Sequence, residues 1–264
     1  MNTQMKRFIV WMAGIPISLA ICASVVLLLM RLEGTLFYLA LAALFLLGVA
    51  VLVISMVRSR KNEKIVNKLL DILYKDADPK AFIAASKAQI QKTRNKALKG
   101  TLSFNLAIGY EADGNFGRAI SVMKETLDLT ADGLTKATYY LNLASFYAQK
   151  GAVNEGLEAY QAGRRYIDKK RKYIPAAYTL FVRGLLFYAE EKDADALDSF
   201  KKINMEEFED RHSVTKLQLY MARAYSRMGN IKEARVLYGK VRQRKTYPYL
   251  LSCANAEIEN LQEK

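Results

Sequence analysis

The chain has few of the residues from which catalytic, metal and disulfide sites are built. Its 264 residues include one histidine, two cysteines and four prolines. The histidine, His212, lies beside an acidic stretch where we expect it to be solvated, and no histidine or cysteine cluster has the spacing of metal ligands. The phosphate-binding pattern G-x-x-x-x-G-K-[ST] is also absent. We therefore expect a non-catalytic protein that needs neither a cofactor nor a metal.

Cysteine and proline usage exclude two further classes. Cys22 lies in an apolar run and Cys253 lies near the other end of the chain, so we expect two free thiols rather than a disulfide. With only 4 prolines and 14 glycines, the composition indicates no long disordered tract.

Two apolar runs occupy the beginning of the chain. Residues 8–30 and 36–57 contain no charged side chain, and each run is long enough to cross a hydrocarbon core about 30 Å thick. Only five residues separate them, so we predict a two-helix transmembrane hairpin. Lys6 and Arg7 precede the first run, and the second is followed by Arg58, Arg60, Lys61 and Lys64. The positive-inside rule then predicts a multi-pass protein with both termini in the cytoplasm, which fits the plasma membrane of a bacterium.

Two other interpretations of the first run remain open, namely a cleaved signal peptide and a lipid-modified cysteine. The stretch Ile21-Cys22-Ala23 is a poor cleavage site, and Ile21 stands where a small residue normally precedes a lipidated cysteine. Since neither run contains an ionisable side chain, we expect an anchor rather than a transport path.

A fixed pattern recurs four times in the second half of the chain. A small residue is followed three positions later by an aromatic residue, and nine positions after that by another small residue. The four copies are Ala107/Tyr110/Ala119, Ala144/Tyr147/Gly156, Gly184/Phe187/Ala196 and Ala222/Tyr225/Ala234. The pattern predicts helix pairs in which the small residues allow close approach of two backbones. Glycine lies at the expected turn in three copies, as Gly114, Gly151 and Gly229, and Glu191 replaces it in the third.

This pattern resembles the tetratricopeptide repeat (TPR) family, whose units are helix-turn-helix pairs of about 34 residues. Residues 100–247 carry the resemblance, with the best matches in Asn105-Leu106-Ala107, Asn142-Leu143-Ala144 and Met221-Ala222 and the positions that follow them. The chain lacks the early tryptophan and the terminal proline of the family. The resemblance implies an all-α, right-handed α-solenoid of about four to five helix pairs that binds other proteins.

We divide the chain accordingly into three parts. Residues 1–57 form the predicted transmembrane hairpin, and residues 58–99 form a basic juxtamembrane segment with a degenerate first helix pair. The two helices of that pair are predicted from Asn62 to Tyr74 and from Pro79 to about Lys96. Residues 100–264 form the TPR-like solenoid, with repeats that start near positions 100, 137, 177 and 215 and a capping helix at about 249–262.

The resemblance also implies a binding groove on the concave face, along the first helix of each repeat. Carried onto this chain, the groove positions include Phe104, Ile108, Leu141, Ser145, Phe181, Leu185, Tyr188, Lys216 and Arg223. The family's clamp for a terminal carboxylate uses lysines and asparagines, whereas Phe104, Leu141, Ile108 and Ser145 stand at those positions here. We therefore expect a protein or peptide ligand, such as an acidic amphipathic helix. The alternative is that another helix of the same chain fills the groove.

The net charge of +14 is concentrated in clusters. Arg58, Arg60, Lys61 and Lys64 adjoin the second apolar run, where we expect them to contact anionic lipids. Three further clusters, at residues 87–99, 164–172 and 240–245, follow predicted helices. They either stabilise helix C-termini, or lie along the inner leaflet, or attract an acidic partner. We do not expect nucleic acid, because we interpret these clusters as lacking the interleaved aromatic residues of a stacking platform.

Together these observations predict a membrane-anchored adaptor that presents a TPR-like groove in the cytoplasm. The alternative is a structural subunit of a larger membrane complex, in which the hairpin packs on other spans through Gly14, Ser18 and Cys22.

Overall fold

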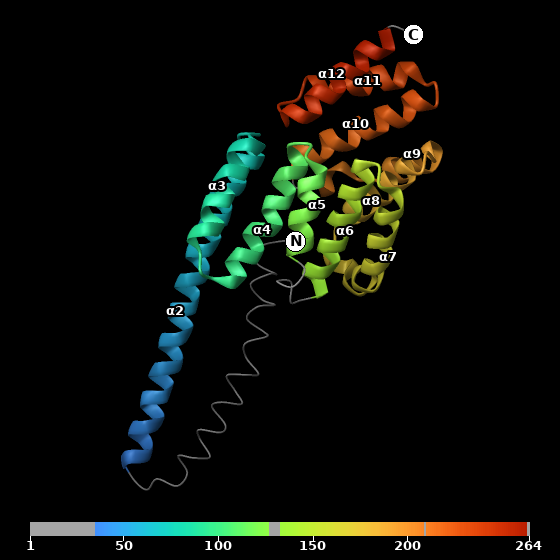
Figure 1. The fold of residues 1–264 in the computed structure, drawn as a ribbon. Helices are drawn as coiled ribbons and strands as arrows, with labels where there is room; N and C mark the ends of the chain where they lie inside the picture. Colours follow the sequence, from blue (N-terminus) through green and yellow to red (C-terminus); the bar gives the residue numbers. More distant parts are fainter. Residues whose placement is uncertain (1–34, 127–132, 209, 263–264) are drawn as a thin grey trace. The chain divides into compact units, whose positions relative to one another are not determined.

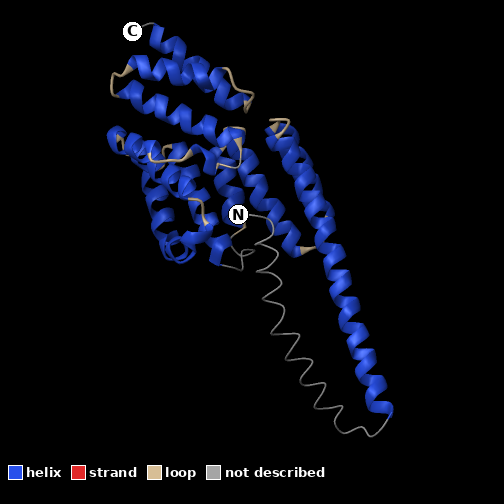
Figure 2. Ribbon diagram, turned by 180° about the vertical axis from the view of Figure 1, so that it is seen from behind, coloured by secondary structure: helices blue, strands red, loops and turns tan. Residues whose placement is uncertain are grey.

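The computed structural model describes residues 35–126, 133–208 and 210–262. Within these ranges the chain consists of α-helices, two short 3-10 helices and connecting loops, and it contains no strand (Figure 2). The predicted all-α class is therefore confirmed for the described residues. The chain divides into two compact units, residues 1–65 and residues 66–264.

The first described element is α2, a single helix that runs from Thr35 to Tyr74. It is the one described helix that is long and apolar enough to cross a membrane, and an 18-residue window of its candidate segment Leu41–Tyr74 has a mean hydropathy of 2.5. The structure therefore supports one such helix and not the predicted hairpin, whose first span lies outside the described residues. The helix that was expected to begin near Asn62 is the last part of α2, because no glycine or proline interrupts residues 49–78.

The second unit is an array of antiparallel helices that follow one another along the chain (Figure 1). Its helices are α3 (Pro79–Lys92), α4 (Lys96–Ala112), α5 (Phe116–Glu125), α6 (Gly133–Lys150), α7 (Val153–Lys170), α8 (Ala176–Ala189), α9 (Asp193–Lys201), α10 (Arg211–Arg227), α11 (Ile231–Arg242) and α12 (Pro248–Gln262). The 3-10 helices η2 (Arg171–Tyr173) and η3 (Met205–Glu207) lie in two of the joints. The pairs α4/α5, α6/α7, α8/α9 and α10/α11 form hairpins, and this is the TPR-like arrangement.

The four hairpin turns have the same hydrogen bonds. One residue in each turn has a left-handed backbone, with φ of 77° at Gly114, 82° at Gly151, 61° at Glu191 and 79° at Gly229. The next residue donates its N–H to the carbonyl of the aromatic residue of the repeated pattern: Asn115 to Tyr110 at 2.8 Å, Ala152 to Tyr147 at 2.9 Å, Lys192 to Phe187 at 2.9 Å and Asn230 to Tyr225 at 2.9 Å. This is the bonding of a Schellman turn, so the aromatic position of the pattern marks the end of the first helix. Glu191 adopts the same turn without the conformational freedom of glycine.

The small residues of the pattern lie where the two helices of a hairpin approach each other. Ala107, Ala119, Ala144, Ala196, Ala222 and Ala234 have no exposed surface. In the third hairpin, a Cβ on Gly184 of α8 would lie 2.3 Å from the ring of Phe200 of α9. Even the Cβ of alanine would clash with the Phe200 ring at that position, so this copy of the pattern requires glycine unless the ring moves.

Asparagine and aspartate side chains set where several helices begin. Asn95 Oδ1 accepts hydrogen bonds from the N–H groups of Ala97 at 3.1 Å and Leu98 at 3.2 Å, so α4 begins at Lys96. As a consequence α3 ends at Lys92, before the predicted end near Lys96. Asp210 caps α10 in the same way, by accepting from the N–H of Ser213 at 2.8 Å.

Contacts between distant parts of the second unit bring the beginning of the array to its end. The ring of Tyr249 in α12 lies against Gly114 of the α4/α5 turn, and its centroid is 5.7 Å from that of Phe116. His212 of α10 donates from Nε2 to the carbonyl of Tyr74 at 2.9 Å and accepts at Nδ1 from the hydroxyl of Thr246 at 3.1 Å.

The prediction that His212 is solvated is therefore wrong, since its side chain is 1% exposed. Its imidazole stacks on the ring of Tyr247, with centroids 4.0 Å apart. Arg211, next to it, also donates to the carbonyl of Lys75 at 2.9 Å. The first residues of α10 thus hold the last turn of α2, which leads into the array.

Candidate functional site

The predicted groove residues fall into two groups in the structure. Leu141, Ser145, Phe181 and Leu185 are buried, with exposures of 0%, 5%, 5% and 1%. The others, Phe104, Ile108, Tyr188, Lys216 and Arg223, are half-buried. The buried group has almost no surface to offer a ligand, so an open apolar groove along the middle of the array is not what the structure presents.

Aromatic side chains of the same chain fill the centre of the predicted groove. The ring of Phe181 lies 5.9 Å from that of Phe200, 6.3 Å from that of Phe208 and 6.4 Å from that of Tyr220. The rings meet edge to face or tilted, as aromatic side chains do in protein cores. This agrees with the alternative that the chain itself fills the stripe, although Phe208 of the joint before α10, rather than a separate helix, contributes to the filling.

A buried ion pair closes the same face further along. The carboxylate of Glu111 in α4 accepts hydrogen bonds from the ammonium of Lys216 in α10 and from Nε2 of Gln149 in α6, the latter at 2.9 Å. Glu111 is 5% exposed and the Lys216 side chain 16%. Because the pair joins residues 105 positions apart, no local pattern could have indicated it.

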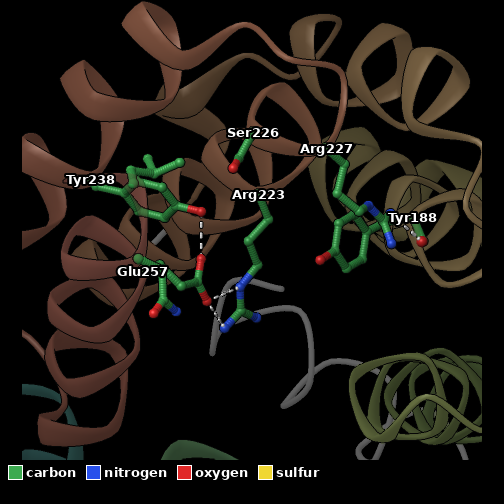
Figure 3. Close-up of a pocket in the computed structure, with 8 residues that line it drawn as sticks. Tyr188, Arg223, Ser226, Arg227, Tyr238 and Glu257 are labelled. Atoms are coloured by element: carbon green, nitrogen blue, oxygen red, sulfur yellow. Dashed lines mark hydrogen bonds and ion pairs between the residues drawn. The ribbon is translucent and has the colours of Figure 1, made fainter. Parts of the chain in front are cut away.

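Beyond this pair the face opens into a polar pocket of about 400 Å³ at the end of the array (Figure 3). Four helices contribute to it, α8, α10, α11 and α12. The residues that line it are Tyr188, Arg223, Ser226, Arg227, Tyr238, Glu257, Asn260 and Leu261. Two of the predicted groove residues, Tyr188 and Arg223, therefore reach a real depression.

Glu257 of α12 is the centre of the polar network in this pocket. Figure 3 shows Arg223 and Tyr238 both directed toward its carboxylate. Arg223 donates from Nε at 2.7 Å and from a terminal nitrogen at 2.6 Å, and the hydroxyl of Tyr238 donates to the other oxygen. Burial, together with this hydrogen bond, raises the pKa of Tyr238, so its hydroxyl stays protonated and remains a donor.

A second arginine lines the pocket, with its own partners. Arg227 donates from Nε to Asp193 at 2.9 Å and from a terminal nitrogen to the carbonyl of Tyr188 at 2.6 Å. Its guanidinium also lies over the ring of Tyr188, 3.7 Å from the centroid. The Arg227 side chain is 34% exposed, twice the 17% of Arg223, so it is the more accessible of the two cations.

The arrangement is suited to binding a carboxylate. Two guanidinium groups and a phenol hydroxyl line one depression, and planar guanidinium groups bind carboxylates through paired N–H donors. In this structure Glu257 occupies the carboxylate position of Arg223 and Tyr238, and Asp193 occupies that of Arg227. The sequence indicated Arg223 through the family resemblance, but it gave no sign of Arg227, Tyr238 or Glu257, which local spacing does not connect.

The candidate lipid-contact residues lie at a different place, on α2. Arg58, Arg60, Lys61 and Lys64 are all exposed. Before them, large apolar side chains of α2 are exposed on every side of the helix, for example Leu39 at 67%, Phe45 at 71% and Ile54 at 66%. Among the residues that the structure describes, no group of three or more histidine, cysteine, aspartate or glutamate side chains could hold a metal ion.

No protein-family model and no curated protein matches this chain. Several solved structures are similar to it in fold, at low identity. MamA, from residue 41 to its end, of Desulfovibrio magneticus RS-1 is 15% identical, with 69% of this chain and 94% of that one covered and a TM-score of 0.40.

Two further solved structures carry the repeat in their descriptions. A tetratricopeptide repeat protein from Parabacteroides merdae ATCC 43184 is 20% identical over 78% of this chain and 75% of its own, with a TM-score of 0.39. A putative kinesin light chain from Podosopora anserina, with TPR-like repeats, is 16% identical over 70% of this chain and 93% of its own, with a TM-score of 0.42. The TPR-like arrangement of the present chain rests on its own hairpin geometry.

Proposed function

We propose that this protein is a membrane-anchored, non-catalytic scaffold, which holds a partner protein at the cytoplasmic face of a bacterial plasma membrane through its TPR-like array. The observation that carries the proposal is the continuity of α2. One helix begins in a segment whose apolar side chains are exposed on all sides and ends as part of the helical array.

Exposed apolar side chains on every face of a helix are unfavourable in water and favourable in lipid. Leu, Ile, Phe and Val each contribute about −0.3 to −0.6 kcal/mol to membrane insertion at a helix centre. Residues 36–57 contain no charged side chain that would oppose insertion, and the basic residues that follow favour a cytoplasmic end. The array is then held close to the membrane by the same helix.

The partner contact that we propose is the polar pocket around Arg223 and Arg227. A partner helix with an acidic residue could replace the internal carboxylate of Glu257 there, or bind Arg227 directly, since Arg227 is the more exposed cation. An acidic helix fits this chemistry, because guanidinium groups pair with carboxylates.

Membrane attachment is tested with the full chain expressed in bacterial cells. We expect the protein in the membrane fraction after washing with alkaline carbonate. At its C-terminus, we expect a reporter that works only in the cytoplasm to be active and a reporter that works only in the periplasm to be inactive. Release of the protein by carbonate would contradict the anchor, and a periplasmic C-terminus would contradict the orientation.

The partner site is tested by crosslinking in intact cells, followed by mass spectrometry. We expect Arg227→Gln to lose a partner that the natural chain captures, while the matched variant Arg118→Gln, at an exposed position of α5, retains it. Equal capture by both variants would contradict a role for the pocket. If capture depends instead on the apolar segment of α2, the chain is a subunit of a membrane complex.

A further inference from the structure

A basic surface at the end of α7 is not used by the proposed scaffold function. Residues 164–173 contain six basic residues, one acidic residue and two tyrosines, Tyr166 and Tyr173. The basic residues are Arg164, Arg165, Lys169, Lys170, Arg171 and Lys172. All are exposed except Lys170, which is half-buried. We name these ten residues, together with Lys136 of α6, the α7 basic surface.

The stability of α7 accounts for only part of this charge. Cations near a helix C-terminus interact favourably with the helix dipole, but the effect is confined to about the last turn. Since α7 ends at Lys170, this explains Lys169 and Lys170. It does not explain Arg164 and Arg165, which lie more than a turn earlier.

Internal ion pairing accounts for even less. Among the described residues, Arg164 is the member of the surface with a carboxylate partner, Asp168, at 3.7 Å. Both side chains are strongly exposed, at 77% and 69%, so this pair adds little stability. Within the described residues, the surface therefore keeps an excess of positive charge.

Tyrosine rings hold several of these cations in place. The guanidinium of Arg165 lies 4.6 Å from the ring centroid of Tyr166, and the ammonium of Lys136 lies 5.6 Å from the same centroid. The ammonium groups of Lys170 and Lys172 lie 5.7 Å and 4.9 Å from the ring centroid of Tyr173. The expectation that the basic clusters lack interleaved aromatic residues is thus wrong here. Contact with a ring limits the motion of a long side chain, so binding an anion costs less entropy.

The same rings are poorly placed to bind nucleic acid bases. Tyr166 stacks on Tyr140, with centroids 6.0 Å apart and planes 8° from parallel. Cations lie against the same ring, so it offers no free face on which a base could stack. Tyrosine and basic side chains that occur together are instead typical of the interface between membrane and water.

We propose that the α7 basic surface binds the phosphate groups of an anionic membrane surface. The inference rests on the proposed function in one respect, namely that α2 anchors the chain. Residues 58–65 alone separate the apolar run from the unit that begins at Val66. Eight helical residues extend about 12 Å, so the array stays at a high effective concentration near the lipid phosphates. The attraction decays within a Debye length and weakens with salt.

Lysine footprinting of the full chain in lipid nanodiscs tests this proposal, because the chain contains its own control. Lys169, Lys170 and Lys172 report on the α7 basic surface, and Lys240 and Lys245 report on a second exposed basic cluster at the end of α11. A water-soluble amine reagent is applied in zwitterionic discs and in discs with about one quarter phosphatidylglycerol. We expect labelling of the first three lysines to slow about fivefold in the anionic discs and to recover at about 0.5 M salt, with a much smaller change at the other two.

Two variants with equal charge removal sharpen the test. In Arg165→Gln/Lys170→Gln/Arg171→Gln/Lys172→Gln we expect Lys169 to lose its protection. In Lys240→Gln/Arg242→Gln/Arg244→Gln/Lys245→Gln we expect Lys169 to stay protected. The variant Tyr166→Leu/Tyr173→Leu keeps every charge, and we expect it to lose part of the protection, because its cations are no longer held by rings.

Several outcomes would overturn the inference. Equal changes at both clusters would show a general attraction of the array, and unchanged labelling in anionic discs would show no lipid contact. Protection of the same lysines by a short RNA in zwitterionic discs, but not by anionic lipid, would assign the surface to nucleic acid. Each of these three results leaves the proposed membrane anchor intact if the chain inserts into the discs. A chain that stays outside the discs would overturn the proposed function, and this inference with it.

Discussion

The apolar part of α2 and the central helix α6 are both rich in apolar residues, but α2 exposes these side chains and α6 buries them. In α2, large apolar side chains are exposed on every side, and residues 36–57 contain no charge. In α6, Leu141, Leu143 and Phe146 are buried, but so are the polar residues Asn142 and Ser145.

The two segments differ in the hydrogen-bond partners that are available to a polar side chain. The hydroxyl of Ser145 accepts from Gln149 at 3.0 Å, and Gln149 also donates to the carboxylate of Glu111 in the neighbouring helix α4 at 2.9 Å. A helix inside a protein can therefore contain polar side chains, because neighbouring groups bind them. A helix surrounded by lipid has no such partners, so its sequence must be apolar throughout. The exposed apolar side chains of residues 36–57 are thus in keeping with the proposed lipid environment, whereas α6 is built for a protein interior.

The largest expected effect separates these two environments directly. Leu141→Ala should lower the free energy of unfolding of the array by about 2–5 kcal/mol, because it leaves a cavity in a fully buried site. The matched change Leu46→Ala, at a side chain 66% exposed, should leave it unchanged. Chemical denaturation of the full chain in detergent, followed by circular dichroism, measures both. Equal losses in the two variants would mean that residues 36–57 form part of a protein core.

A charge placed in α2 tests the other half of the comparison. Leu47→Arg should raise the free energy of membrane insertion by about 2.5–3.5 kcal/mol and shift protein out of the membrane fraction. Val236→Arg, at a side chain of α11 that is 57% exposed, introduces the same charge into the array and should not change the membrane fraction. Fractionation with quantitative immunoblotting compares the two, and full membrane retention of Leu47→Arg would refute a membrane span.

Two ion pairs of the array, one buried and one exposed, should contribute differently to its stability. Lys216→Met should cost about 2 kcal/mol of stability, since it leaves the buried carboxylate of Glu111 without its cation. Lys202→Met removes a cation from the exposed pair with Asp198 and should cost less than about 0.5 kcal/mol. Denaturation curves of the two variants decide the matter. Similar costs would show that the Glu111 pair does not hold α4 against α10.

A smaller effect concerns the one hairpin turn that lacks glycine. Glu191→Gly should raise stability by about 0.5–1 kcal/mol, because φ at this position is 61° and a side chain is disfavoured there. Glu190→Gly, one position earlier with φ of −78°, should lower stability instead. The two melting temperatures should therefore move in opposite directions, and movement in the same direction would exclude backbone strain as the cause.

The smallest expected effect is a pH dependence from His212. Burial is the main cause that lowers the pKa of His212 below its usual 6.5, although the hydrogen bond to the Tyr74 carbonyl acts in the opposite sense. The unfolded chain therefore binds a proton near pH 6.5 that the folded chain resists. Stability from this group should be complete above that pH and should decrease as the pH falls below it. The melting temperature of His212→Gln should fall less between pH 7.5 and 5.5 than that of the natural chain, and equal slopes would contradict this role.

Local features of the fold were predictable from the sequence, for reasons that individual residues make clear. Gly114, Gly151 and Gly229 marked the turns because glycine is the residue that adopts positive φ without strain, and all three do so. The small residues of the repeated pattern marked close helix approaches, as the approach of the Phe200 ring to Gly184 confirms. Each of these features depends on residues a few positions apart, which a periodic pattern contains.

The site was much less predictable. Leu185 and Phe181 were assigned to an open face because the family resemblance places them there, but both are buried, and Phe181 packs against Phe208 of the joint before α10 and Tyr220 of α10. His212 looked exposed because its sequence neighbours are acidic, yet Tyr74 and Thr246 bind both of its ring nitrogens. A resemblance transfers the positions of residues along a helix, but it does not transfer how tightly neighbouring repeats close on each other.

Residues close together in the chain are enough to specify the helical class, the positions of the turns and the uninterrupted apolar stretch of α2, because each follows from backbone preference or from a short pattern. Tertiary structure alone decided that Glu111 meets Lys216, that Tyr249 lies against Gly114, and that Arg223, Tyr238 and Glu257 share one pocket. These contacts depend on the rotation accumulated from one helix pair to the next. A small change in that angle moves the ends of the array by many ångströms, and no local pattern specifies it.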